Sequence, residues 1–279
     1  MKKISRRSFL AAAGLSVAAL ALTACGGSSA STASSVASSA ASSEAASTSA
    51  AAGELTTVEA GKLTMATNAA FPPYEMTTDA GEFEGIDIET AQAIADKLGL
   101  ELQIDDMDFD AALLSVQQGK ADIVMAGVTV TDERKAVMDF SDSYATGIQS
   151  IIVPEGSDIA SPDDLAGKKI GTQRGTTGYI YCSDDFGDDN VVAYDDGLTA
   201  VQALNTGQVD AVVIDNAPAQ EFVAANPGLK ILDTSYAEED YAIGMAKGSS
   251  LEDAVNAALE ELKADGTLQS IVDKYITAE

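Results

Sequence analysis

The sequence has no histidine, no tryptophan and only two cysteines, and these absences limit the chemistry that we expect of it. Histidine is the commonest general base of enzymes and the commonest transition-metal ligand, so its absence argues against both roles. We expect no metal and no cofactor, because the carboxylates also show no metal-binding spacing. If Cys25 is modified, Cys182 has no partner for an intramolecular disulfide, and we interpret it as a half-buried, unreactive thiol.

Basic residues are also scarce, with 16 of them against 44 acidic residues. Residues 1–24 hold four of the basic residues and no acidic ones, so their removal leaves 12 basic and 44 acidic residues, a net charge of -32. This balance argues against binding of nucleic acid and against a basic patch for anionic lipid headgroups. It suits a protein that is held near a membrane by a lipid anchor alone.

Residues 1–24 have the pattern of a signal peptide, in which four basic residues precede the apolar run 9–22. The run is too short to remain as a membrane-spanning helix. The segment SRRSFL resembles a twin-arginine export signal, and an ordinary secretory signal that contains two arginines fits it equally. The run ends in LTAC, which resembles the lipobox of bacterial lipoproteins. That resemblance implies that Cys25 is lipidated and becomes the mature N-terminus; an unmodified cysteine near a cleavage site is the alternative.

Residues 25–53 consist almost wholly of serine, alanine, threonine and glycine. Such a segment cannot bury enough apolar surface to offset the conformational entropy that ordering costs. We interpret it as a flexible tether with a reach of roughly 30 Å. The remaining residues, 54–279, are enough for two small lobes or one large domain.

From residue 62 on, apolar runs alternate with segments of helical periodicity, which predicts an α/β fold of mainly parallel sheets covered by helices. Asp87 and Asp108 are expected to cap two helices that end at Gly99 and Gly119. Residues 68–74 contain two consecutive prolines and are expected to form a loop. The expected strands are 63–66, 100–104, 123–125, 151–153, 169–171, 191–194, 211–214, 229–232 and 242–245. Later helices are expected at 198–206, 217–225, 251–262 and 268–276, and a helix start at 161–164.

Two segments of the chain resemble each other: residues 113–125 read LLSVQQGKADIVM, and residues 201–213 read VQALNTGQVDAVV. Each gives a helix, a glycine that ends it, a turn with aspartate and a buried strand. In this alignment Gly127 matches Asp215. The repetition predicts two doubly wound lobes that present strand ends to one ligand cleft, because ligands of such sheets bind at the carboxyl ends of the strands.

Lobe 1 is expected to comprise residues 54–146 and 242–279, and lobe 2 residues 147–241.

The loop 126–134, AGVTVTDER, follows a buried strand and opens into a short helix that Thr131 is expected to cap. Free backbone N–H groups and the helix dipole favour an anion at such a helix start. Arg134 adds a planar donor suited to a carboxylate. The residues therefore predict half of a clamp on a small carboxylate ligand; the alternative is that Arg134 pairs with a surface acid.

Residues 63–276 resemble the type-2 periplasmic binding proteins, specifically the polar amino-acid-binding (family 3) proteins of ABC importers. The resemblance rests on six segments together: ATNAAFPPYE, FEGIDIETAQAIADKLG, DFDAALLSVQQGKADIVMAGVTVTDERK, FSDSY, LAGKKIGTQRGTTG and LKADGTLQSIVDKY. It implies two α/β lobes that are joined by two crossing strands and close on the ligand. It also implies an extracytoplasmic monomer that delivers an amino acid to a membrane permease.

By position, the resemblance implies that Arg134 holds the ligand α-carboxylate, helped by Gly127, Thr129 and the backbone near Thr177. It implies that Asp215, from the other lobe, holds the α-ammonium. One guanidinium and one carboxylate on opposite lobes match a zwitterion. The alternative for Asp215 is a cap on the helix that follows it.

Phe71 and Phe109 are implied as apolar walls of the side-chain pocket, with core packing as the alternative. Asn68 stands where many members of the family carry aspartate, which meets the positive end of basic ligands. Asn68 lacks that charge and so argues against lysine or arginine. Arg174 could meet an acidic side chain or could be solvated. A neutral polar or an acidic amino acid is therefore expected.

The main rival is an enzyme, because the family resembles cyclohexadienyl dehydratases. Such an enzyme needs a positioned general acid, and acids such as Glu75 and Asp106 are present without any sequence feature that singles them out. A sensor lobe or interaction module is a second rival. We expect a binding protein, anchored to the cell membrane through Cys25, that delivers an amino acid to an ABC transporter.

Overall fold

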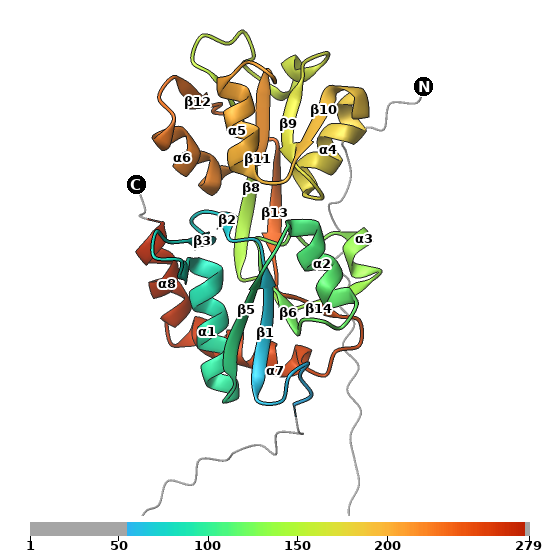
Figure 1. Cartoon of the computed structure of the whole chain (residues 1–279), viewed down its shortest axis with the longest axis vertical. Helices are drawn as coiled ribbons and strands as arrows, with labels where there is room; N and C mark the ends of the chain where they lie inside the picture. Colours follow the sequence, from blue (N-terminus) through green and yellow to red (C-terminus); the bar gives the residue numbers. More distant parts are fainter. Residues whose placement is uncertain (1–54, 277–279) are drawn as a thin grey trace, which may run out of the picture. The chain divides into compact units, whose positions relative to one another are not determined.

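The computed structural model describes residues 55–276. The predictions for the signal peptide, for Cys25 and for the tether at 25–53 lie outside these residues. Within residues 55–276, no helix is long and apolar enough to cross a membrane. The described chain forms two lobes, each built on its own β-sheet with helices packed against it (Figure 1).

The first lobe contains a five-stranded sheet in the order β5–β1–β6–β14–β7. Its strands are β1 (Lys62–Thr67), β5 (Glu101–Asp106), β6 (Ile123–Val124), β7 (Met138–Phe140) and β14 (Gly244–Ala246). β1 pairs in parallel with β5 and β6, whereas β14 pairs antiparallel with β6 and β7. The sheet is therefore mixed, which corrects the prediction of mainly parallel sheets. The cause is the chain path, since β14 enters this sheet on the return from the second lobe.

The second lobe contains the order β10–β9–β11–β8–β12, with β13 paired to β8. Its strands are β8 (Ala145–Pro154), β9 (Ile170–Gln173), β10 (Val191–Tyr194), β11 (Ala211–Asp215), β12 (Leu229–Ile231) and β13 (Ala237–Tyr241). β9 is parallel to β10 and β11, and β8 is antiparallel to its three partners.

β8 and β13 form a two-stranded ribbon that runs between the lobes (Figure 1). The first half of β8 pairs with β13, and its second half pairs with β11 and β12 inside the second sheet. The predicted strands 151–153 and 242–245 left out the beginning of β8 and all of β13. β13 reads AEEDY, and a ribbon strand with one partner and little apolar surface gives no hydrophobic signal.

Side chains alternate across each central strand and so enter two different cores. In β1, Leu63 and Met65 pack with helix α1 (Ile86–Leu98), whereas Ala66 packs with helix α2 (Phe109–Gln117). β11 divides in the same way, with Val212 in one cluster and Val213 in the other. Strands buried on both faces read as apolar runs, which is why the sequence revealed them.

The other helices are near the expected positions. They are α3 (Asp132–Lys135), α4 (Thr177–Phe186), α5 (Gly197–Asn205), α6 (Asn216–Ala225), α7 (Glu252–Ala264) and α8 (Thr267–Tyr275). Short 3-10 helices span Pro162–Leu165 and Asp188–Asn190. Residues expected as a loop and turn contain a small sheet of β2 (Ala70–Phe71), β3 (Glu75–Thr77) and β4 (Phe83–Glu84).

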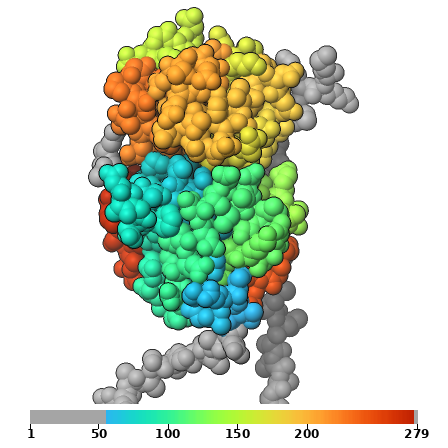
Figure 2. Space-filling view, in the orientation of Figure 1, coloured from blue at the N-terminus to red at the C-terminus, as the bar shows by residue number. Residues whose placement is uncertain are grey.

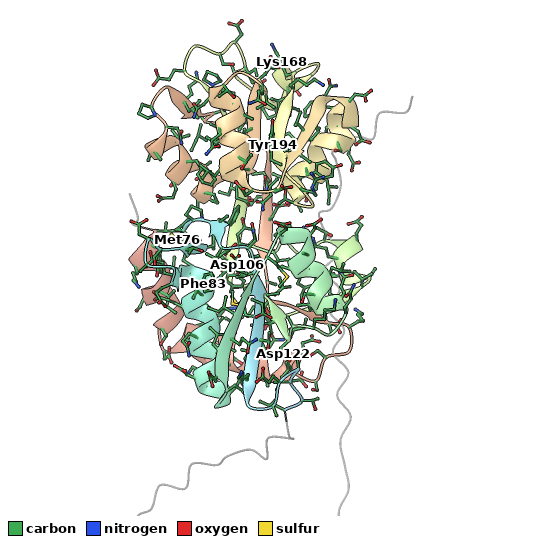
Figure 3. All side chains as sticks on the ribbon, in the orientation of Figure 1. Met76, Phe83, Asp106, Asp122, Lys168 and Tyr194 are labelled. Carbon is green, nitrogen blue, oxygen red and sulfur yellow. The ribbon has the colours of Figure 1, made fainter. Side chains whose placement is uncertain are left out.

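Asp87 does not cap α1, contrary to prediction: the helix begins at Ile86 after Gly85, and Asp87 is buried inside the first lobe. Asp108 occupies the capping position of α2 without a side-chain capping bond. Cys182 is fully buried, more than predicted, and burial raises the pKa of its thiol to about 12, so it stays protonated. Figure 3 labels Asp106 and Asp122 at opposite ends of the first sheet, and the end with Asp106 faces the second lobe.

Candidate functional site

A pocket with about 300 Å³ of space between atoms lies where the two lobes meet. Figure 2 shows the lobes in contact along this junction on the face that is viewed. Loops that follow β1, β6, β9 and β11 contribute to it, as expected for ligand sites at the carboxyl ends of strands. Its lining residues are Asn68, Phe71, Glu75, Phe109, Ala126, Gly127, Thr129, Arg134, Gln173, Thr176, Thr177 and Asp215.

Arg134 enters the pocket from the first lobe with only 8% of its surface exposed. Thr131 accepts a hydrogen bond from its backbone N–H at 3.2 Å, so the predicted cap is confirmed. Its Nη1 donates to the Thr129 carbonyl at 2.7 Å, and its Nη2 donates to the Gly175 carbonyl at 3.1 Å. Two of five N–H groups are thus engaged by carbonyls. The alternative that Arg134 pairs with a surface acid is excluded, since no described acid lies within ion-pair distance.

Helix α3, which follows the loop, has only four residues, so its dipole adds little to this anion site. The guanidinium itself supplies the positive charge. Burial lowers the pKa of Arg134 from its usual value, but an arginine remains charged at any physiological pH. The ring of Phe109 lies 5.4 Å from the guanidinium carbon, in the range of a cation–π contact.

Asp215 ends β11 in the second lobe and faces the same pocket. It does not cap α6 with its side chain, so the alternative role is not observed. Its Oδ2 accepts a hydrogen bond from Gln149 Nε2 at 2.8 Å, and its Oδ1 accepts one from the Tyr241 hydroxyl. Burial raises the pKa of Asp215 to about 7, and nearby Glu239 adds to the increase. A positive charge placed here would stabilise the carboxylate.

Apolar rings line part of the pocket. Phe71 lies on β2 and Phe109 begins α2, so both come from the first lobe. Gly127 has a left-handed backbone with φ 54°, and a Cβ there would lie 2.8 Å from the Phe71 ring. Glycine at this position therefore lets the ring approach the loop that carries Thr129.

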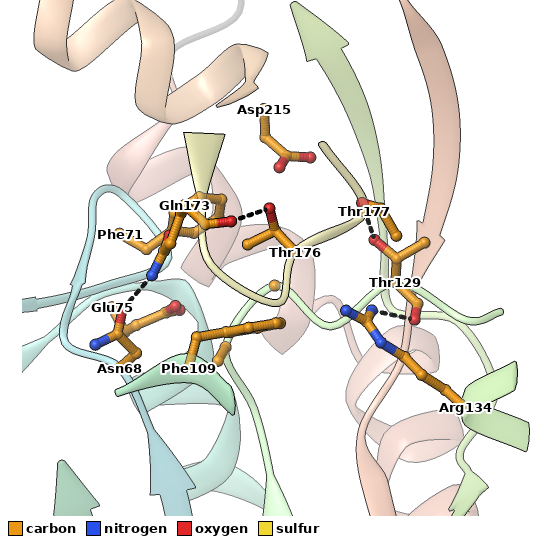
Figure 4. Close-up of a pocket in the computed structure, with 12 residues that line it drawn as sticks. Asn68, Phe71, Glu75, Phe109, Thr129, Arg134, Gln173, Thr176, Thr177 and Asp215 are labelled. Carbon is orange, nitrogen blue, oxygen red and sulfur yellow. Dashed lines mark hydrogen bonds between the residues drawn. The ribbon is translucent and has the colours of Figure 1, made fainter. Parts of the chain in front are cut away.

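Hydrogen bonds across the pocket connect the two lobes (Figure 4). Gln173 Nε2 donates to Asn68 Oδ1 at 2.8 Å, and Asn68 Nδ2 donates to the Met107 carbonyl at 2.9 Å. On the opposite side, the hydroxyls of Thr129 and Thr177 lie 3.4 Å apart. Both hydroxyls also donate to Glu239 Oε2, at 3.3 and 3.0 Å.

Glu75 is a lining residue that the sequence analysis did not single out. Its side chain is fully buried, and neither oxygen accepts a hydrogen bond from a described donor. Burial raises the pKa of Glu75 well above its usual value, and the neighbouring Asp87 raises it further. Burial likewise raises the pKa of Asp87 to about 6, against hydrogen bonds from the Gly127 N–H and the Tyr144 hydroxyl.

Of the nine ligand-binding residues predicted, the structure brings eight to the pocket and places Arg174 outside it. The Arg174 side chain is half exposed, with Nη2 at 3.4 Å from the Ala193 carbonyl and at 3.7 Å from Asp195. β9 ends at Gln173, and Arg174 is the first residue of the turn that follows, where its side chain is exposed. Of the two alternatives expected for Arg174, its exposure in this structure agrees with the solvated side chain.

Three further lining residues were not predicted, although each lies in or beside a predicted loop: Ala126, Gln173 and Thr176. Ligands of such sheets bind in the loops at the carboxyl ends of the strands, so including every residue of these loops would have identified all three. Two residues of the connecting ribbon donate hydrogen bonds to Asp215, namely Gln149 and Tyr241. No sequence pattern had marked either of them as part of the site.

Comparisons with known proteins agree with this arrangement. Residues 63–278 match the bacterial extracellular solute-binding proteins, family 3. The L-cystine-binding protein TcyJ of Escherichia coli (strain K12) is 33% identical over 226 residues, which are 79% of this chain and 85% of that protein.

Two solved structures of an ancestral arginine-binding protein are also similar. The one bound to glutamine is 42% identical, with a TM-score of 0.75 over 78% of this chain and 99% of that chain. The one bound to arginine is 43% identical, with a TM-score of 0.74 over 77% and 98% of the two chains. The family match covers most of the sequence and both lobes of the fold, and the chain therefore belongs to the bacterial extracellular solute-binding proteins of family 3.

Proposed function

We propose that this protein is a receptor that captures an amino acid between its lobes and delivers it to the permease of an ABC importer. One observation carries the proposal: a buried guanidinium and a buried carboxylate, from opposite lobes, line one pocket without an ion-pair partner among the described residues. Buried charges are costly unless they are paired, and a zwitterion supplies both missing charges.

The ligand α-carboxylate is assigned to Arg134, whose remaining N–H groups are available for a charge-assisted bond. Thr129 and Thr177 present hydroxyls beside it, and Gly127, whose lack of a side chain lets the Phe71 ring approach, is assigned to the same end of the pocket. The α-ammonium is assigned to Asp215, whose carboxylate Gln149 and Tyr241 already orient.

The ligand side chain is assigned to the wall formed by Asn68, Phe71 and Phe109. Among the twelve lining residues Arg134 is the single basic one, and the α-carboxylate uses it. With Arg174 outside the pocket, an acidic side chain has no cation to meet. Of the two expected ligand classes, a neutral polar amino acid is therefore the one that the pocket supports, and a relative named for cystine binding fits this choice.

We further propose that the protein acts as a monomer outside the cytoplasm, anchored to the cell membrane through a lipid on Cys25. The LTAC sequence and the polar segment that follows it support the anchor. Lobe boundaries at 146/147 and 241/242 are proposed with it, because they fall at the beginning of β8 and the end of β13.

A binding screen tests the proposal: thermal unfolding of the full-length protein in mild detergent, with each of the twenty amino acids, cystine and prephenate. A ligand at large excess over its dissociation constant should stabilise the protein by roughly 3–4 kcal/mol. Arg134→Ala and Asp215→Asn should each weaken binding about 30-fold or more, because each leaves a buried ligand charge unpaired. Arg174→Ala and Asp195→Asn, at exposed positions, are the matched controls.

A dehydratase on this fold remains the competing function. Glu75 is a buried acid in the pocket and so could serve as a general acid. Turnover of prephenate or arogenate, lost in Glu75→Gln, would favour the enzyme. Stabilisation by amino acids without turnover favours the receptor, and no stabilisation by any amino acid contradicts it.

A further inference from the structure

Glu75 is a carboxyl group that the proposed clamp does not use, although it faces the same pocket. Its side chain is fully buried, and none of the donors in residues 55–276 reaches either oxygen. Figure 4 shows it beside Asn68 and far from Arg134, at the end of the pocket where the ligand side chain would lie. A protonated Glu75 can donate to Asp87 with one oxygen, and its other oxygen is then available to whatever fills this end of the pocket.

The groups that face Glu75 are acidic or neutral. They come from every element packed around it: Asp87 from α1, Asp106 from the end of β5 and Asp215 from β11. Tyr74 and Tyr144 complete its titratable neighbours. None of these groups carries a positive charge, so nothing in this cluster neutralises an ionised Glu75.

Glu75 and Asp87 lie close enough to share one hydrogen bond, which requires a proton on one of the two carboxyl groups. Asp87 already accepts bonds from the Gly127 N–H at 3.0 Å and from the Tyr144 hydroxyl at 2.8 Å, both on Oδ2. Both donors favour an ionised Asp87. Glu75 has no such donors, so the proton of the pair resides on Glu75.

We propose that Glu75 is a specificity-determining residue whose protonation follows the charge of the ligand side chain. This inference rests on the proposed function. With a neutral amide side chain, Glu75 keeps its proton and the pair carries one negative charge. With a guanidinium or ammonium side chain, Glu75 releases its proton to solvent and binds the cation as a carboxylate. The reaction exchanges one proton for one positive ligand charge, so charge balances within the pocket.

The exchange supplies the charge that Asn68 lacks. Asn68 alone excludes basic ligands, but an ionisable Glu75 admits them in return for a proton. The affinity for arginine should therefore rise relative to that for glutamine as the pH rises, up to tenfold per pH unit while Glu75 is protonated in the free protein. The α-ammonium group acts on Asp215 equally in both ligands and cancels in the comparison.

Isothermal titration calorimetry measures the exchange directly. Full-length protein in detergent is titrated with glutamine and with arginine at pH 7, in phosphate and in Tris, whose ionisation enthalpies differ. The expected result is about one more proton released with arginine than with glutamine. Glu75→Gln should remove this difference, whereas Glu82→Gln, an exposed neighbour, should keep it.

Equal proton release with the two ligands, persistence of the difference in Glu75→Gln, or failure of arginine to bind up to pH 9 while glutamine binds would each overturn the inference. Binding of neither ligand would contradict the proposed function instead. Carbon-13 NMR of the glutamate side-chain carboxyls tests separately whether Glu75 is protonated in the ligand-free protein. A resonance that is lost in Glu75→Gln and remains protonated at pH 7 supports the shared proton, and titration of that resonance below pH 5 overturns it.

Discussion

Four acidic side chains surround the pocket, and their charges set the properties of the ligand-free protein. Glu75, Asp87, Asp215 and Glu239 are all buried, and none forms a salt bridge with a described basic residue. Hydrogen bonds to the last three offset part of the cost of burying them. These buried carboxyl groups thus lower the stability of the ligand-free protein but remain available to a ligand, which is common in binding sites.

This cost predicts how stability depends on pH. Burial raises the pKa of Asp215 to about 7 and that of Asp87 to about 6. Above the usual carboxyl pKa, the folded state therefore holds more protons than the unfolded state. The free energy of unfolding should fall as the pH rises from about 4, by about 1.4 kcal/mol per pH unit for each group, up to about pH 6 for Asp87 and about pH 7 for Asp215. Urea unfolding of the ligand-free protein between pH 5 and 8 measures the slope.

Asp215→Asn removes one of these groups and should raise the unfolding free energy at pH 8 by up to about 4 kcal/mol, because the pKa of Asp215 lies about three units above its usual value, while it flattens the slope. The same variant should bind its ligand worse, so stability and binding change in opposite directions. Asp195→Asn, at an exposed position, should change neither. A loss of stability at pH 8 in Asp215→Asn would show that the carboxylate stabilises the fold and would contradict the burial argument.

A site residue can be predicted from the sequence when it lies at the end of a strand with a recognisable apolar pattern. Arg134 and Asp215 follow apolar strands in a repeated pattern, so their positions at strand ends are visible in the sequence. Glu75 lies on a short strand after two prolines, and no local pattern places it in the pocket. Arg174 is next to the lining residue Gln173 in the sequence but begins the turn after β9, and its exposure there cannot be read from the local pattern.

At the scale of elements, the repeat seen in the sequence is a repeat in the structure. Gly119 follows α2 with φ 66°, and Gly207 follows α5 with φ 70°. Asp122 Oδ2 accepts a bond from the Thr64 N–H, and Asp210 Oδ2 accepts one from the Lys169 N–H, both at 2.8 Å. In each lobe the aspartate thus ties the beginning of one parallel strand to the next.

The two aspartates differ in burial, which predicts unequal contributions to stability. Asp122 is buried and also accepts a bond from the Val58 N–H at 2.7 Å, whereas Asp210 is exposed. Asp122→Ala leaves a buried Thr64 N–H without a partner and should cost about 2–3 kcal/mol of unfolding free energy. Water can replace the side chain of Asp210, so Asp210→Ala should cost about 1 kcal/mol or less. Equal losses in urea unfolding would refute this explanation.

The elements that the sequence did not reveal are those with little apolar surface. The strands of β2–β3–β4 have two or three residues each, too few for a periodic pattern. β13 carries an exposed acid on either side of Glu239, and β8 is its one strand partner apart from an isolated bridge between Tyr241 and Thr129. These elements form because neighbouring segments offer backbone partners, and such long-range pairing cannot be read from local sequence.

At the scale of the whole described chain, Glu239 on β13 connects the lobes and the ribbon between them. Its Oε2 accepts bonds from Thr129 in the first lobe, from Thr177 in the second lobe and from Gln149 on β8. One carboxylate thus joins the groups that approach each other when the lobes meet. Charge-assisted bonds of this kind are stronger than bonds between neutral groups.

Glu239→Ala should therefore loosen the contact between the lobes. We expect a larger radius of gyration of the ligand-free protein by small-angle X-ray scattering, and a loss of about 1–3 kcal/mol in unfolding free energy, because three donors lose their acceptor. Saturating ligand should restore the compact form, since Arg134 and Asp215 still bridge the lobes through it. Glu238→Ala, at the exposed neighbouring position, is the matched control. An unchanged radius of gyration in ligand-free Glu239→Ala would mean that direct contacts such as Gln173 with Asn68 are sufficient to hold the lobes together.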